Sequence, residues 1–137
     1  MIPFQLRKLD HVVLRVRDLE RSLRFYRDVL GCQLDKVQER IGLYQVRAGD
    51  SLIDLVPLDG PLGRLGGAGP GTEGRNLDHF AIQVTPFDED AIRAHLAAHK
   101  IEITDSGRRY GAEGDGPSIY IRDPDGNIVE LKGPPAH

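Results

Sequence analysis

Residues 9–16 read LDHVVLRV, and residues 77–84 read LDHFAIQV. Both stretches begin with Leu-Asp-His and continue with apolar residues at alternate positions, the period of a β-strand with one buried face. The two histidines, His11 and His79, are separated by 68 residues (79 − 11), about half of the 137-residue chain. The sequence therefore predicts two copies of one structural module.

A helix is predicted after each of these two strands. The first covers Asp18–Leu30, with Asp18 as N-cap and Gly31 at the position where many helices end. Its apolar stripe consists of Leu19, Leu23, Tyr26 and Leu30. The second covers Pro86–Lys100, with Thr85 as the cap and Pro86 in the first turn.

Three more strands are predicted in each half, so both halves have the order β-α-β-β-β. In the first half they are Cys32–Gln38, Ile41–Ala48 and Ser51–Pro57. In the second half they are Glu102–Asp105, Ser118–Arg122 and Asn127–Lys132. The second half is longer, and we assign its extra residues to a loop at Gly107–Pro117. The predicted fold class is α+β.

We expect one domain over residues 1–137. Module one spans about residues 8–57, and module two spans about residues 77–132. The Gly- and Pro-rich stretch at residues 58–76 is predicted to be a linker or a loop over the site. It is not a phosphate-binding loop, because no Gly-Lys-Ser/Thr follows its glycines.

Composition excludes several classes of protein. The net charge of −3 and the pI of about 5.9 do not favour binding to nucleic acid or to an anionic membrane. Cys32 is the only cysteine, which rules out an intrachain disulfide and a Cys-based zinc cluster. We see no signal peptide and no apolar run of membrane-spanning length, so a cytoplasmic location is expected.

Each half also contributes one histidine and one carboxylate. The carboxylates are Asp54 and Glu130, each between two apolar residues of the last strand of its module. A pseudo-two-fold relation between the modules would bring all four side chains together. Two imidazoles and two carboxylates suit a divalent first-row metal. We therefore predict His11, His79 and Glu130 as metal ligands and Asp54 as a fourth candidate, although a histidine beside an aspartate is also common as a hydrogen-bonded structural residue.

Three segments carry a resemblance to a known family: HVVLRVRDLERSLRFYRDVLG (11–31), LDHFAIQV (77–84) and SIYIRDPDGNIVEL (118–131). They resemble the vicinal oxygen chelate superfamily, which includes glyoxalase I, extradiol dioxygenases, fosfomycin-resistance thiol transferases and bleomycin-resistance proteins. The resemblance implies two βαβββ modules that form an incomplete barrel, often in a homodimer. It also implies one divalent metal ion (Ni, Co, Zn, Mn or Fe(II)) that binds neighbouring oxygens of a small substrate.

A glyoxalase-like lyase or isomerase is the first function that the resemblance implies. Glu130 or Asp54 would then move a proton, and Arg15, Gln83 and Tyr120 would orient the substrate. Arg15 matches an arginine that contacts glutathione in bacterial glyoxalase I, which makes glutathione a candidate cosubstrate. Two positions depart from that enzyme: Asp54 replaces a glutamate ligand, and Leu58 replaces an asparagine.

Two other functions stay open. The segment from Ile119 to Glu130 fits the end of the extradiol dioxygenase signature, and two histidines with one carboxylate suit Fe(II). That signature also requires a histidine near residues 111–113, where this chain has Gly-Ala-Glu, and Asp123-Pro124-Asp125-Gly126 is a good turn in its own right. The third possibility is a binding protein without catalysis. The remaining histidines, His95, His99 and His137, are expected to lie outside the site.

Overall fold

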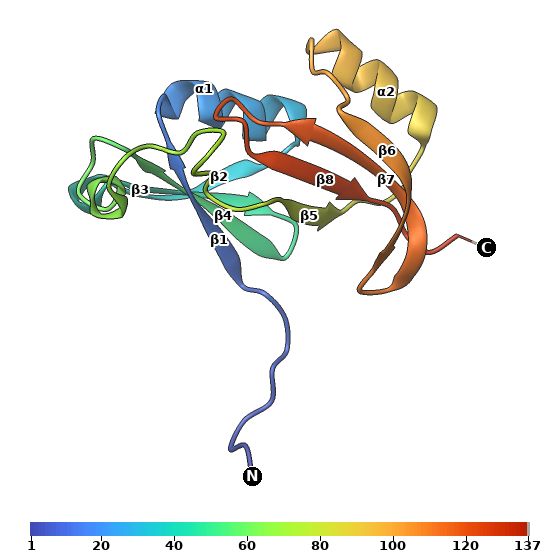
Figure 1. The fold of residues 1–137 in the computed structure, drawn as a ribbon, viewed down its shortest axis with the longest axis horizontal. Coiled ribbons are helices and arrows are strands. Elements are labelled where there is room, and N and C mark those ends of the chain that lie inside the picture. Colours follow the sequence, from blue (N-terminus) through green and yellow to red (C-terminus); the bar gives the residue numbers. More distant parts are fainter. Residues whose placement is uncertain (137) are drawn as a thin grey trace. The chain divides into compact units, whose positions relative to one another are not determined.

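The computed structural model describes residues 1–136, so the prediction about His137 lies outside the described residues. The chain divides into two compact units: the first is Met1–Gly69, and the second begins at Pro70. Each unit contains one four-stranded sheet and one main helix (Figure 1). This is the predicted α+β class, with the order β-α-β-β-β in each unit.

The first unit contains β1 (His11–Val16), β2 (Gln33–Gln38), β3 (Leu43–Ala48) and β4 (Ser51–Pro57). Their order in the sheet is β1-β4-β3-β2, with β1 parallel to β4 and the other pairs antiparallel. The crossover from β1 is α1 (Leu19–Arg24), which continues into a π-helical turn at Phe25–Val29. Short 3-10 turns lie at Glu39–Ile41 and Gly63–Gly66.

The second unit repeats this topology. It contains β5 (Phe80–Gln83), α2 (Glu89–Ala98), β6 (Asp105–Gly111), β7 (Gly114–Arg122) and β8 (Ile128–Lys132). The sheet order is β5-β8-β7-β6, again with a parallel first pair and antiparallel pairs after it. In both units the strand that begins with the Leu-Asp-His repeat therefore lies beside the strand that carries the candidate carboxylate.

The first predicted helix is confirmed, but its buried face is different. Asp18 accepts a hydrogen bond from the Arg21 amide at 3.1 Å, as an N-cap should, and Gly31 follows with φ of +78°. The expected stripe was right at Tyr26, which is fully buried, but Leu19, Leu23 and Leu30 are only half-buried. Ser22 and Phe25, which were not part of the stripe, are buried as well. The π-helical turn accounts for part of this shift, since it changes the rotation between Arg24 and Leu30.

The second helix begins later than predicted. Asp88, not Thr85, is the N-cap, and its carboxylate accepts from the Ala91 amide at 3.1 Å. Aspartate is a stronger capping residue than threonine. The Thr85–Pro86 peptide bond is cis and precedes the helix. The residues just before Asp88 therefore connect β5 to α2 and are not helical.

The predicted loop at Gly107–Pro117 was also wrong. Most of these residues belong to a hairpin in which Asp105–Gly111 pairs with Gly114–Arg122. The predicted strand at Glu102–Asp105 overlaps β6 only at its last residue. The segment Asp105–Gly111 has no apolar alternation, because its sequence is DSGRRYG, and it is held by backbone pairing to β7. Local sequence could not reveal that partner.

The alternate residues of the repeat face inward to different extents in the two units. Leu14 and Val16 of β1 are fully buried, whereas Phe80 and Ile82 of β5 are half-buried. The second unit also buries Ile119 and Ile121 of β7 completely. Within residues 1–136, the helices are too short or too polar to span a lipid bilayer. Cys32 is buried after the π-helical turn, and burial raises the pKa of its thiol to about 11.

We expect Cys32 to be nearly inert to thiol reagents in the native protein. A pKa of about 11 in place of 9.0 lowers the thiolate fraction at neutral pH about 100-fold, and burial also blocks access. Labelling by a chromogenic disulfide at pH 8 should be at least about 100-fold slower than in denaturant. Rapid native labelling would show that this part of the core opens readily.

Candidate metal centre

The aspartates of the Leu-Asp-His repeats orient the histidines that follow them. His11 Nδ1 lies 2.8 Å from Asp10 Oδ1, and His79 Nδ1 lies 2.7 Å from Asp78 Oδ2. Each carboxylate accepts a proton carried by Nδ1, which leaves Nε2 as the free nitrogen. This contact raises the pKa of His11 and lowers the pKa of Asp78. The repeated Asp-His pair therefore forms the same side-chain contact in both units.

The free nitrogen of each histidine faces the carboxylate on the neighbouring strand. His79 Nε2 is 3.3 Å from Glu130 Oε1, and His11 Nε2 is 3.8 Å from Asp54 Oδ2. Both carboxylates are buried, whereas both histidine side chains are about two-fifths exposed, at 44% for His11 and 40% for His79. The predicted pairing of one His with one carboxylate is therefore present inside each unit.

Asp54 is held by a chain of two glutamines. Gln45 lies opposite Asp54 in the β3–β4 ladder, and its Nε2 donates to both carboxylate oxygens, at 3.1 and 3.2 Å. Gln38 Nε2 in turn donates to Gln45 Oε1 at 3.1 Å. Because the amide oxygen of Gln45 is engaged by Gln38, its NH₂ group faces Asp54.

Glu130 is held by hydroxyl groups. Ser118 Oγ donates to Glu130 Oε2 at 2.7 Å, and the Tyr120 hydroxyl also hydrogen bonds to Glu130. Burial, together with the bond to Glu130, raises the pKa of Tyr120. The guanidinium of Arg109 lies 5.5 Å from the centre of the Tyr120 ring and donates to Asp105 at 3.1 Å. Tyr120 is therefore firmly placed beside Glu130, and its ring centre lies 5.9 Å from that of His79.

The same register positions carry these groups in both units. Asp54 pairs with Val13 on β1 and Gln45 on β3. Glu130 pairs with Ala81 on β5 and Tyr120 on β7. Gln45 and Tyr120 are thus structural equivalents, each reaching one carboxylate from the next strand. The repeat extends beyond the histidines to the side chains that support the carboxylates.

The spacing of these donors can be compared with a metal site. Two ligands of one tetrahedral ion, each at about 2.0–2.2 Å, lie roughly 3.3–3.6 Å apart. The His79–Glu130 pair, at 3.3 Å, matches this spacing, and the His11–Asp54 pair, at 3.8 Å, is slightly wider. Within residues 1–136, neither unit brings together three or more such donors. Each unit therefore holds one histidine–carboxylate pair, a pair of donors whose chemistry suits a divalent cation.

The other expected site residues lie on the same strands. Arg15 donates to the carbonyl oxygens of Gly67 and Ala68, at 3.0 and 2.9 Å, so it holds the middle of the Gly-rich stretch against β1. A side chain at Gly66 would require this guanidinium to shift. Gln83 is exposed on β5, at alternate spacing from His79. Their roles toward a substrate stay predictions.

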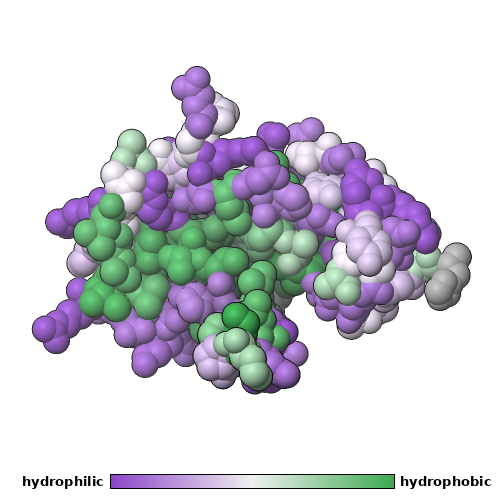
Figure 2. All heavy atoms as spheres, turned by 60° about the horizontal axis from the view of Figure 1, so that its bottom comes forward, coloured by the Kyte–Doolittle hydropathy of each residue, from purple (hydrophilic) through white to green (hydrophobic). Residues whose placement is uncertain are grey.

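Apolar surface adjoins the His11–Asp54 pair, which is the first half-site; the His79–Glu130 pair is the second. Val13 lies on β1 between His11 and Arg15, and it is half exposed at 51%. Figure 2 shows apolar side chains gathered on the left of the view, the side on which Figure 1 places β1 to β4. A ligand at His11 would therefore meet apolar as well as polar groups.

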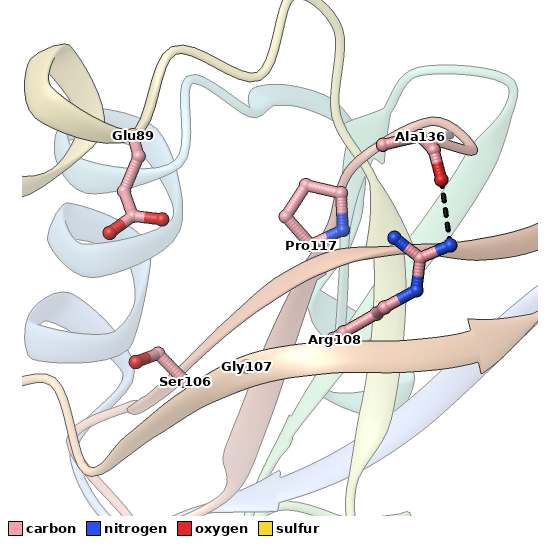
Figure 3. A pocket seen from close by; sticks show the side chains of 6 residues that line it. All are labelled: Glu89, Ser106, Gly107, Arg108, Pro117 and Ala136. Atoms are coloured by element: carbon pink, nitrogen blue, oxygen red, sulfur yellow. Dashed lines mark hydrogen bonds between the residues drawn. The ribbon is translucent and has the colours of Figure 1, made fainter.

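A separate pocket lies on the second unit, away from the predicted ligands. It has a volume of about 320 Å³ and lies between the start of α2, the β6–β7 hairpin and the C-terminal segment (Figure 3). The side chain of Arg108 donates there to the Ala136 carbonyl at 2.7 Å, and Glu89 forms an ion pair with Arg93. The lining residues are Glu89, Ser106, Gly107, Arg108, Pro117 and Ala136, none of them a predicted site residue.

Sequence reasoning missed the residues that support the half-sites. Asp10 and Asp78 are part of the repeat, so the recurrence of Asp before His could have identified them as supporting residues. Gln38, Gln45 and Ser118 carried no such signal, because their partners lie on other strands. Strand register alone brings them to the carboxylates.

The comparisons with known proteins agree with this fold. Residues 8–131 match the model of the Glyoxalase/Bleomycin resistance protein/Dioxygenase superfamily. Virulence protein STM3117 of Salmonella typhimurium is 30% identical over 129 residues, covering 90% of this chain and 82% of that protein. Its crystal structure superposes with a TM-score of 0.75 at 25% identity, covering 96% of this chain and all of that chain (100%). Mouse mitochondrial methylmalonyl-CoA epimerase is 29% identical over 135 residues, covering 94% and 74% of the two chains.

Proposed function

Because the chain belongs to the Glyoxalase/Bleomycin resistance protein/Dioxygenase superfamily, we propose that it is a metal-dependent lyase or isomerase for a small substrate with neighbouring oxygens. Members of this superfamily are typically metal-dependent and act on small molecules. The observation that carries the proposal is the pair of equivalent half-sites, each with a histidine Nε2 facing a buried carboxylate. His11, His79 and Glu130 would hold one divalent ion, with Asp54 as a fourth candidate ligand.

The bound ion would act as a Lewis acid toward the substrate oxygens. A carboxylate, Glu130 or Asp54, accepts a proton from the carbon beside such an oxygen and returns it to the same or the adjacent carbon. The proton count balances, so the reaction needs no further reactant. Arg15, Gln83 and Tyr120 would orient the substrate, and Asp10 and Asp78 would hold the histidine Nδ1 atoms so that Nε2 of each ring is directed to the ion.

The names of two similar proteins support the reaction class that we favour. One relative is named methylmalonyl-CoA epimerase, and a structure with the same fold, at 21% identity, is named lactoylglutathione lyase. Both names denote substrates with carbonyl chemistry, and proton transfer by a buried carboxylate fits that class. We further propose a homodimer in the cytoplasm, with glutathione as one candidate cosubstrate.

A ring-cleaving dioxygenase is the second candidate. Catechol-2,3-dioxygenase of Bacillus subtilis is 31% identical over 124 residues, although this chain covers only 40% of that protein. The wider 3.8 Å separation at Asp54 favours a site of two histidines and one carboxylate, the arrangement typical of Fe(II) oxygenases. Gly111-Ala112-Glu113 still lacks the histidine expected for this chemistry.

The first test is metal analysis of the purified protein, followed by reconstitution with Ni, Co, Zn, Mn and Fe(II). About one ion per chain is expected. Isomerisation of an acyl-thioester or of a hemithioacetal would support the lyase or isomerase, whereas oxygen uptake with a catechol would support the dioxygenase. Tight ligand binding without turnover under any metal would overturn both in favour of a binding protein.

We expect Asp78→Asn to weaken metal binding about 10- to 100-fold, because the amide no longer accepts the Nδ1 proton as a carboxylate does. Asp10→Asn should act similarly on the first half-site. Affinity is measured by competition with a chromophoric chelator. Asp90→Asn, on the exposed side of α2, is the matched control. Unchanged affinity in Asp78→Asn would show that the Asp-His contact does not support metal binding.

A further inference from the structure

The two carboxylates are held in different ways, and this difference separates their roles. Ser118 occupies Glu130 Oε2 and leaves Oε1 directed at His79 Nε2, 3.3 Å away. Gln45 instead occupies both oxygens of Asp54. The Asp54 oxygen that faces its histidine, Oδ2, lies 3.8 Å from His11 Nε2 but only 3.2 Å from Gln45 Nε2. Glu130 is thus presented toward its histidine, whereas Asp54 is drawn toward the neighbouring strand.

We infer that Gln45, oriented by Gln38, is a positioning residue that keeps Asp54 out of the metal's ligand set, so that Asp54 serves as the proton acceptor. This inference rests on the proposed function and assigns a role that the proposal above left to either carboxylate. His11, His79 and Glu130 are then the ligands. A carboxylate that does not ligate the ion keeps its lone pairs available for a substrate proton.

Side-chain length supports this assignment. The side chain of Asp54 is one methylene shorter than that of Glu130. The two residues occupy equivalent register positions, Asp54 opposite Val13 on β1 and Glu130 opposite Ala81 on β5. The carboxylate oxygens of Asp54 therefore extend less far from an equivalent backbone position. Burial leaves only 4% of the Asp54 side chain exposed, so the amide of Gln45 replaces water as its hydrogen-bond donor. That donor is itself fixed, because Gln38 engages its oxygen.

The test uses Co²⁺, whose visible absorption reports the ligand set. Wild type, Gln45→Leu and Gln45→Met are titrated with Co²⁺, and each substitution is repeated in an Asp54→Asn background. Without the amide, Asp54 is free to turn toward the ion. We expect a changed visible spectrum and at least about tenfold tighter Co²⁺ binding, both absent when Asp54 is Asn. Gln38→Leu should change the visible spectrum and the Co²⁺ affinity in the same direction, but by less.

Gln33→Leu, at the exposed start of β2, is the control for removing a glutamine. An unchanged spectrum in both Gln45 variants, or weaker Co²⁺ binding, would overturn the inference, since Gln45 would then be neutral or would support Asp54 as a ligand. These results leave the metal function intact. Failure of the wild type to bind Co²⁺ at all would overturn the proposed function, and this assignment with it. The Gln45→Met variant keeps the length of the side chain, so folding is preserved if Leu disturbs it.

Discussion

His79→Ala is expected to reduce bound metal from about one ion per chain to less than about 0.1 while the protein stays folded. Under the proposed function the imidazole is one of the ligands, and removing it would leave Glu130 as the sole donor of the His79–Glu130 pair. The fold should persist because the His79 side chain is 40% exposed and is not among the buried core residues. Metal content is measured by mass spectrometry after gel filtration, and folding by circular dichroism.

His99→Ala is the matched control, because His99 is an exposed histidine at the end of α2. It should retain the full metal content. Glu130→Gln should also lose most of the metal, since an amide oxygen is a far weaker ligand than a carboxylate. Full metal content in His79→Ala would show that the second half-site does not hold the ion.

Asp123→Ala is expected to lower the free energy of unfolding by about 3 to 5 kcal/mol, because three hydrogen bonds to a buried carboxylate are lost. Its Oδ1 accepts from the amides of Asp125 and Asn127, at 2.9 and 2.8 Å. Its Oδ2 accepts from the Asn127 side chain at 2.8 Å. Only 5% of Asp123 is exposed, so water cannot replace these bonds in full.

The measurement is chemical denaturation of the metal-free protein, which separates stability from metal binding. Glu113→Ala, in the exposed turn between β6 and β7, should change stability by less than about 0.5 kcal/mol. Asp123→Asn should fall between the two, because its amide oxygen still accepts. A loss of metal affinity without a loss of stability would instead assign Asp123 to the site, against the interpretation of this segment as a turn.

The repeat determined much of the fold without any tertiary information. Large apolar residues occupy alternate positions along LDHVVLRV and LDHFAIQV, and this local pattern decides which face of each strand is buried. Because the pattern recurs, the module order, the first helix with its Asp18 cap, and the placement of one His and one carboxylate per module all followed from it. These are features that neighbours in sequence specify.

Strand pairing decided the rest. The β6–β7 hairpin forms although DSGRRYG has no strand-like alternation, since its backbone groups pair with Gly114–Tyr120, a partner that no local pattern identifies. The same ladders place Gln45 opposite Asp54 and Tyr120 opposite Glu130. The sequence alone therefore predicted one histidine and one carboxylate for each module. Only the register of the sheets decided which neighbours hold the carboxylates, because register joins Gln45 to Asp54, 9 positions apart, and Tyr120 to Glu130 on the next strand.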